Sequence, residues 1–373
     1  MTCVLHEILA PDLGPSVSPD RGSVSPAAGR RVVIVSARVG AGHDGAASEL
    51  ARRLRERQLL VDRFDFLDLL PGRLGRLLCD GYHRQLEVAP RSWDWLLSAL
   101  GHAPLSGAAR LFATSAARNL AEVLAADPAD DNVLAVSTYP LASHALAQLK
   151  RRGLLTAPLA VYLTDPSVHP LCVTRHADLT VAPNQIAARQ ARRLGAGETL
   201  VAKPVVDPGF RPLLTAAERG HLRAKFGLPQ RERLALVLSG SWGVGQVEET
   251  VADIVASGQA RPVVVCGRNE SLRERLRRAG IADVFGWVDV MPELMRACDV
   301  VVQNAGGLAT SEALETGLPV LTYRCLPGHG RANAAVLAAD GTVPWVKAAA
   351  DLPRALAAAL RVEQSDAPVV AAG

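Results

Sequence analysis

Aromatic residues are scarce in this chain. They make up 4% of its 373 residues, while hydrophobic residues together reach 49%, so aliphatic side chains supply most of the apolar content. That balance favours alternating strands and helices over a β-sandwich. The length suits two domains better than one.

Other features are missing as well. No apolar run reaches the ~18 residues that a transmembrane helix needs. Residues 1–28 are rich in Pro, Ser and Gly and lack the basic start and apolar run of a signal peptide, so we expect a disordered tail. The six cysteines form no CxxC pair, which argues against a zinc site. Cys266 and Cys298 stand in apolar runs and are expected to be buried thiols in a reducing compartment, which favours the cytoplasm.

The charge is only mildly basic. The formal net charge is +4, and no Lys/Arg run with interleaved aromatics indicates nucleic acid binding. This balance suits a phosphate-bearing substrate or an anionic membrane surface. Residues 67–115 mix Leu and Trp with several arginines, which is typical of a peripheral membrane face but equally of ordinary amphipathic helices.

Apolar runs alternate with helix-like segments. The runs are continuous, which is the pattern of parallel strands covered on both faces. Helices are expected between them, for example at 44–58 and 271–280, and the repeated order predicts a doubly wound α/β sheet. The clearest expected strands are 30–37, 132–138, 159–165, 179–183, 233–240, 261–267, 299–305 and 318–324.

The series of strands and helices restarts after a Pro-rich stretch at 204–214. The sequence therefore predicts an N-terminal domain at 29–205, a second domain at 206–347, and a C-terminal helix and tail at 348–373. Two Rossmann-like domains facing each other across a cleft are the simplest architecture. Ligands should then lie beyond the carboxyl ends of strands, where the strand order reverses.

The first of three glycine loops follows the first expected strand. Gly40 and Gly42 allow close backbone approach, and the helix that follows offers unpaired N–H groups. The spacing is not GxGxxG, so a simple tight turn explains it equally well. His43 stands at the helix start and is a candidate general base, although it could also be a surface or capping histidine.

Two more glycine loops occur in the second half. Gly240, Ser241, Gly243 and Gly245 could form a nest of N–H groups for a diphosphate, but the Lys-Ser/Thr of a P-loop is missing. Near residue 306, paired glycines precede a helix whose N–H groups would face a phosphate. Glu312 lies about one and a half turns into that helix, where a carboxylate could accept both hydroxyls of a ribose or could simply be solvated.

Together these stretches resemble a known group. "VVVCGRN" (263–269), "GWVDVMPELMRACDVVVQNAGGLATSEAL" (286–314) and "GLPVLTYRCLPGHGRAN" (317–333) look like the donor domain of inverting GT-B glycosyltransferases. The pattern is closest to the monogalactosyldiacylglycerol synthases of glycosyltransferase family 28, and more distantly to the peptidoglycan lipid-intermediate N-acetylglucosaminyltransferase. "VGAGH" (39–43), 82–100, 137–153 and 161–173 are similar to the acceptor domain of that group.

The resemblance implies transfer of a sugar from a UDP-sugar to a hydroxyl of a lipid acceptor, without a further cofactor. No DxD-type acid pair follows an expected strand, so we expect the donor site to work without a metal. Glu312 would hold the ribose, backbone N–H groups the diphosphate, and the Val288 backbone the uracil. His43 or Asp165 would be the base, beside Gly42 and His169 on the acceptor side. The implied donor-binding residues are Ser241, Gly243, Arg268, Val288, Gly306, Gly307, Leu308, Glu312, His329, Arg331 and Asn333.

The chain departs from this pattern at two places. Val206 stands where relatives often carry an arginine that contacts the nucleotide, and Lys203 or Arg211 could take over that contact. Ala41 and Asp44 replace a glycine and a basic residue of the plant lipid enzymes, which leaves the acceptor open. A soluble hydrophobic small molecule as acceptor, and a UDP-sugar epimerase or hydrolase on the same fold, are the alternatives. The sequence does not indicate which sugar is transferred.

Overall fold

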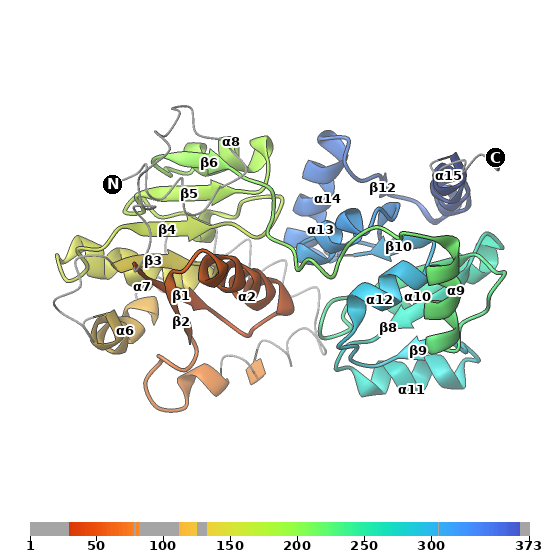
Figure 1. Cartoon of the computed structure of the whole chain (residues 1–373), viewed down its shortest axis with the longest axis horizontal. Helices are drawn as coiled ribbons and strands as arrows, with labels where there is room; N and C mark the ends of the chain where they lie inside the picture. The colour runs from red at the N-terminus through yellow and green to blue at the C-terminus, as the bar shows by residue number, and fades with distance from the viewer. Residues whose placement is uncertain (1–29, 78–79, 82–111, 125–132, 305, 366–373) are drawn as a thin grey trace. The chain divides into compact units, whose positions relative to one another are not determined.

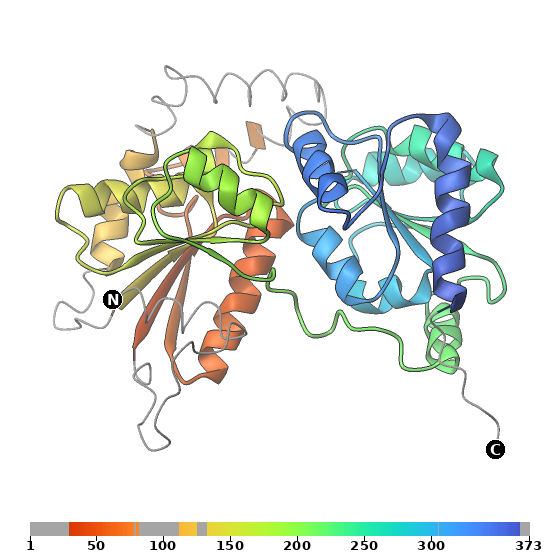
Figure 2. The ribbon, with the colours of Figure 1, turned by 90° about the horizontal axis from the view of Figure 1, so that it is seen from above.

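The computed structural model describes residues 30–77, 80–81, 112–124, 133–304 and 306–365, and it divides into two units, Met1–Val205 and Val206–Gly373 (Figure 1). Each unit holds one six-stranded sheet in which every strand pair is parallel. Helices cover both faces of each sheet (Figure 2). The predicted fold class, two doubly wound Rossmann-like domains, is confirmed. The tail predicted at 1–28 lies outside the described residues.

The first unit has the strand order β2-β1-β3-β4-β5-β6. Its strands are β1 (Arg31–Ser36), β2 (Leu60–Asp65), β3 (Val133–Ser137), β4 (Leu159–Tyr162), β5 (Leu179–Ala182) and β6 (Thr199–Val201). Its helices are α2 (Ala41–Glu56), α6 (Ala117–Leu124), α7 (Pro140–Arg151) and α8 (Gln185–Arg193), with short 3-10 turns η1 (Thr114–Ala116) and η2 (Pro170–Cys172).

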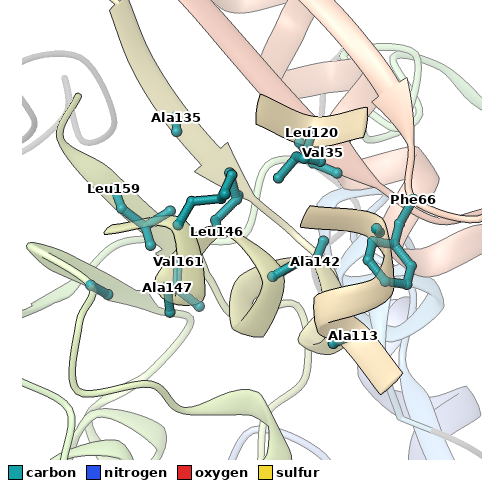
Figure 3. Packing of buried hydrophobic residues seen from close by; sticks show 14 of the residues in the cluster. Val35, Phe66, Ala113, Leu120, Ala135, Ala142, Leu146, Ala147, Leu159 and Val161 are labelled. Carbon is teal, nitrogen blue, oxygen red and sulfur yellow. The ribbon is translucent and has the colours of Figure 1, made fainter. Parts of the chain in front are cut away.

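Strand β1 explains why the predicted strands are continuous apolar runs. Val35 faces one cluster of buried residues, which includes Leu120 of α6 and Leu146 of α7 (Figure 3). Ile34 faces a second cluster, together with Leu54 of α2. Because successive side chains point to opposite faces and both faces are buried, neither face tolerates polar residues.

The second unit has the strand order β12-β11-β10-β7-β8-β9. Its strands are β7 (Leu234–Leu238), β8 (Arg261–Val265), β9 (Val284–Phe285), β10 (Val300–Gln303), β11 (Val320–Tyr323) and β12 (Trp345–Val346). Its helices are α9 (Ala216–Lys225), α10 (Val247–Ser257), α11 (Glu270–Arg278), α12 (Met291–Ala297), α13 (Leu308–Glu315), α14 (His329–Ala339) and α15 (Leu352–Ser365), with η3 (Ala349–Asp351) before α15.

Helix α15 is an integral part of the second unit. Leu352 and Leu356 are fully buried in the same cluster as Ile254 of α10. The C-terminal segment expected to begin at residue 348 therefore completes one helical layer of this sheet. Cys266 and Cys298 are buried free thiols, as predicted.

The four strands missed by the sequence prediction are the four edge strands, β2, β6, β9 and β12. They are short or polar: β2 reads LVDRFD, and β9 and β12 have two residues each. An edge strand has a neighbour on one side only and is less buried, so it does not need the continuous apolar run that marks a central strand.

An aspartate before a strand fastens the central strands of each unit at their amino ends. Asp299 donates its amide to the Leu234 carbonyl at 2.9 Å and accepts the Leu234 amide at its Oδ2 at 2.6 Å. Asp178 makes the same reciprocal pair with Leu159, at 2.9 and 2.7 Å. Asp299 is 1% exposed and is also held by two arginines of α9, Arg219 at 2.9 Å and Arg223 at 2.8 Å.

Replacing Asp299 should therefore be costly. Asp299→Ala leaves two guanidinium groups and a strand amide without their acceptor, so we expect a loss of about 3–5 kcal/mol in the free energy of unfolding, measured by urea denaturation. Asp340→Ala, at an exposed position after α14, should stay within about 0.5 kcal/mol of wild type. Equal effects of the two substitutions would contradict the assignment.

Candidate functional site

The predicted donor residues lie where the strands of the second sheet end. The strand order reverses between β10 and β7, which lie side by side. Helix α13 follows β10 and helix α10 follows β7, and the two helices pack on opposite faces of the sheet. The loop after β7, residues 239–245, and the turn after β10 therefore meet at the reversal, which is where open α/β sheets bind ligands.

Glycines let the loops after β7 and β8 pack backbone against backbone. A Cβ at Gly243 would lie 2.4 Å from the Cys266 carbonyl oxygen, and one at Gly267 would lie 2.4 Å from the Ser241 carbonyl oxygen. The Arg268 amide donates to that Ser241 oxygen at 2.9 Å. Any side chain would separate these loops, so glycine keeps Ser241 beside Arg268.

The turn after β10 also depends on glycine. Gly306 has a φ of +76°, and a Cβ there would lie 3.0 Å from the Asn333 Cβ. The Gly306 amide donates to Gln303 Oε1 at 2.5 Å, so it is engaged within the protein. Gly307, which precedes α13, and Leu308, its first residue, are the other two positions whose amides are predicted to face a diphosphate. Amides at a helix start attract anions.

Asn304 joins three loops. Its Nδ2 donates to the Val244 carbonyl at 2.8 Å, and its carbonyl accepts the Leu326 amide at 2.8 Å. Asn304 Oδ1 and Thr310 Oγ1 of α13 are buried and have no hydrogen-bond partner among the described residues. Such atoms are rare in folded proteins, so a bound molecule or a water that reached them would be stabilised.

Glu312 is half-buried on α13, and no side-chain hydrogen bond holds its carboxylate within the described part of the chain. Burial raises the pKa of Glu312 to about 7, and the nearby Asp207 carboxylate adds to the increase. An acid whose charge is disfavoured in this way destabilises the fold near neutral pH. Perturbed acids of this kind concentrate at functional sites.

Arg268 contacts two indole rings that the sequence prediction did not include. Its guanidinium carbon is 5.4 Å from the Trp242 ring centroid and 4.6 Å from that of Trp287. Trp287 Nε1 donates to Asp289 Oδ1 at 2.8 Å. Both tryptophans stand next to glycines in the sequence, and this position could have identified them as candidate site residues. Val288 packs its side chain on the core, which suits a contact through its backbone.

The predicted sugar-binding residues on α14 differ in exposure. His329 begins the helix and is half-buried, and Arg331 is exposed. Asn333 is fully buried against Gly306. In this structure the Asn333 side chain therefore supports the Gly306 turn, and its contact with a donor sugar stays a prediction.

In the first unit His43 lies at the equivalent reversal, between β1 and β3. It follows Gly42 in the first turn of α2 and is half-buried. Its Nδ1 is 3.1 Å from Thr164 Oγ1, and its carbonyl accepts Thr138 Oγ1 at 3.2 Å. The ring of Tyr139 lies edge-on at 5.5 Å between centroids. Residues that follow β3 and β4 therefore hold the imidazole in place.

The structure brings Asp165 to the same place, because it directly follows Thr164. Asp165 is half-buried. Burial of the Cys172 thiol raises its pKa to about 12, and the negative charge of Asp165 adds to the increase. His169 Nδ1 accepts the Leu171 amide at 3.2 Å and so begins η2. His169 therefore has a capping role besides any contact with an acceptor.

The departures from the family pattern also have structural settings. Asp44 accepts Ser36 Oγ at 3.2 Å and pairs with Arg63 at 2.8 Å, so its charge is balanced. Arg211, one candidate for the arginine absent at Val206, pairs with Glu218 at 2.8 Å. Lys203, the other candidate, is exposed.

Most of the segment 67–115, interpreted above as a membrane face, lies outside the described residues. In its described part Leu77 is 65% exposed. No helix of the described residues has the length and apolar content needed to cross a bilayer. Within the same residues no cluster of three or more His, Cys, Asp or Glu side chains could hold a metal ion.

Comparison with known proteins gives the following. No family model matches the chain. The chain is 27% identical over 211 residues to a processive diacylglycerol beta-glucosyltransferase of Bacillus cereus, covering 54% of this chain and 53% of that protein. A protein of the same name from Bacillus thuringiensis is 27% identical over 213 residues, with the same coverage. The chain thus spans about half the length of the curated relatives it matches.

Solved structures show the fold. MurG of Acinetobacter baumannii superposes with a TM-score of 0.51 at 15% identity, over 91% of this chain and 96% of that chain. HepE of Anabaena in complex with UDP and glucose superposes with a TM-score of 0.52 at 16% identity, over 90% of this chain and 95% of that chain. The resemblance in fold that the motifs predicted, to GT-B glycosyltransferases, is confirmed.

Glu312 should limit the stability of the protein. Because its pKa is about 7 in the folded state and about 4.5 unfolded, the folded state binds more protons between these values. Stability is therefore lost as pH rises from 4.5 to 7. Glu312→Gln should raise the free energy of unfolding by about 1–3 kcal/mol at pH 8 and change it little at pH 4. Denaturation at both pH values tests this, and a loss of stability at pH 8 would contradict it.

Proposed function

We propose that this chain transfers a sugar, with inversion, from a UDP-sugar to a hydroxyl of a diacylglycerol-like lipid. Two independent likenesses support the proposal. The curated relatives are named for glucosyl transfer to diacylglycerol, and a structure of the same fold is in complex with UDP and glucose. The proposed site residues lie at the strand-order reversals, where this kind of fold binds ligands.

The observation that carries the proposal is the arrangement around α13. The helix start supplies amides at Gly307 and Leu308, and Glu312 lies on the same helix without a hydrogen-bond partner for its carboxylate among the described side chains. A nucleoside diphosphate needs both features, because its phosphates need donors and its ribose hydroxyls need an acceptor. Loop 240–245 supplies the opposite wall of this donor site.

Departure of UDP is assisted by these amides. Negative charge grows on the diphosphate as the bond to C1 breaks, and oriented N–H dipoles stabilise it without reorganising. The proposed reaction therefore needs no metal ion. Turnover should persist in a chelating agent, and turnover that is lost there and restored by Mg²⁺ or Mn²⁺ would contradict this part of the proposal.

The acceptor hydroxyl loses its proton to His43 as it attacks C1 from the face opposite the leaving group. A base acting through Nε2 requires Nδ1–H to donate to Thr164 Oγ1, and the 3.1 Å contact allows that tautomer. Asp165 is the alternative base, one residue further along the chain. A single in-line displacement of this kind inverts C1.

The donor assignment predicts a specific loss of binding. Glu312→Gln should weaken UDP binding by about 1–3 kcal/mol in calorimetry, because the amide oxygen accepts ribose hydroxyls less strongly than a carboxylate. Glu315→Gln, on the same helix but exposed, is the matched control and should bind UDP as wild type does. Unchanged affinity in the Glu312 variant, or no UDP binding by wild type, would overturn the donor site.

The base assignment predicts a loss in kcat. His43→Ala should lower kcat by about 10²–10⁴ with UDP affinity nearly unchanged, since the imidazole acts only on the acceptor proton. His176→Ala, an exposed histidine of the same unit, should retain full turnover. If His43→Ala stays active while Asp165→Asn does not, the carboxylate is the base. Full activity in both variants would refute the proposed chemistry.

A further inference from the structure

A cavity of about 440 Å³ opens at the carboxyl ends of β11 and β12, in the size range of small-molecule sites. No residue of the proposed ribose and diphosphate contacts lines it. The side chains that define it are Gln246, Tyr323, Arg324, Arg331, Trp345 and Lys347.

The cavity adjoins two of the proposed donor loops. Gln246 directly follows Gly245, the last residue of the glycine loop after β7. Arg331 lies in the segment proposed to contact the donor sugar. A Cβ at Gly245 would lie 2.7 Å from Asn304 Nδ2 and 3.0 Å from Leu326 Cδ2, so the same loops are in contact beside the cavity. A sugar extending from the diphosphate toward α14 would therefore approach this cavity.

The lining is cationic. Three of the lining side chains, Arg324, Arg331 and Lys347, carry a positive charge, and none of the lining residues is acidic. One carboxylate, Asp253 of α10, pairs with Arg324 at 2.7 Å. No acidic side chain in the lining balances the charges of Arg331 and Lys347.

Two of the cations are held in place before any ligand binds. Arg324 donates from both Nε and NH2 to Asp253 Oδ2, at 2.9 and 2.7 Å, and has a φ of +44°, which is strained for a residue with a side chain. Lys347 Nζ lies 4.9 Å from the centroid of the Trp345 ring. Lys347 is exposed, so a ligand can reach it, and strain and pre-arranged charge of this kind suit a binding site.

We propose that this cavity binds the carboxylate of an acidic donor sugar, so that the preferred donor is a UDP-hexuronate rather than a neutral UDP-hexose. The inference rests on the proposed function and specifies its donor. The amides of the α13 start and the 240–245 loop already serve the diphosphate, so these cations are additional to it. A neutral hexose has hydroxyls but no charge to pair with them, whereas a carboxylate makes charge-assisted hydrogen bonds to Arg and Lys.

Calorimetry with UDP, UDP-glucose and UDP-glucuronate tests the inference. Wild type should bind UDP-glucuronate about tenfold or more tightly than UDP-glucose, as expected for a new charge-assisted contact. The double variant Arg331→Gln, Lys347→Gln should lose this preference and retain its affinity for UDP. Arg354→Gln, which removes an exposed arginine of α15 outside the cavity, is the matched control and should keep the preference.

The other outcomes separate the two levels of the argument. UDP binding without a preference for UDP-glucuronate overturns this inference alone, and absence of UDP binding overturns the proposed function with it. Equal losses of UDP and UDP-glucuronate affinity in the double variant would mean that the cations serve the diphosphate, against the inference. Thermal stabilisation of wild type, but not of the double variant, by inorganic phosphate, with no gain from UDP-glucuronate, would assign the cavity to a free anion and overturn the sugar assignment.

Discussion

Close approach of backbone to backbone is the constraint on which the second unit depends. The loops after β7 and β8 meet so tightly that a Cβ at Gly243 or Gly267 would lie 2.4 Å from a carbonyl oxygen. A strand-order reversal brings loops together, but only residues without side chains let them touch. The position of Ser241 beside Arg268 and the contacts of Arg268 with Trp242 and Trp287 follow from this close approach.

Strong stabilising contacts lie at the amino ends of the strands of this sheet, and several destabilising features lie at the carboxyl ends. At the amino ends, Asp299 combines a strand amide and two arginines into a buried network. At the carboxyl ends lie an acid whose pKa is raised to about 7, two buried polar atoms that have no hydrogen-bond partner among the described residues, and the positive φ of Arg324. Each of these three features costs stability. A bound ligand would relieve the cost of the buried acid and of the two polar atoms. This distribution is expected where one end of the strands holds the fold together and the other end binds a ligand.

The central strands could be predicted because burial on both faces demands unbroken apolar runs, as in β1 and β7. The edge strands β2, β6, β9 and β12 could not, because an edge does not impose that pattern. Glycine pairs and Glu312 were visible as motifs. The burial of Asn333 was not, because its environment comes from Gly306, distant in sequence. The contacts of Thr164 with His43 and of Asp253 with Arg324 could not be predicted either, because the partners are distant in sequence.

The two units carry different groups at the same strand-order reversal, and the proposed function gives these groups different physical tasks. In the second unit the residues at the reversal are glycines and helix amides, and this suits a diphosphate, whose charge is spread over several oxygens and is best met by several fixed dipoles. In the first unit the residue at the reversal is His43, held by Thr164 and Tyr139. Removal of a proton needs a single titratable atom at one position, which a backbone amide cannot provide. A fold that places loops at its reversals can thus meet both needs, and under the proposed function the side chains that follow the strands decide which task each unit performs.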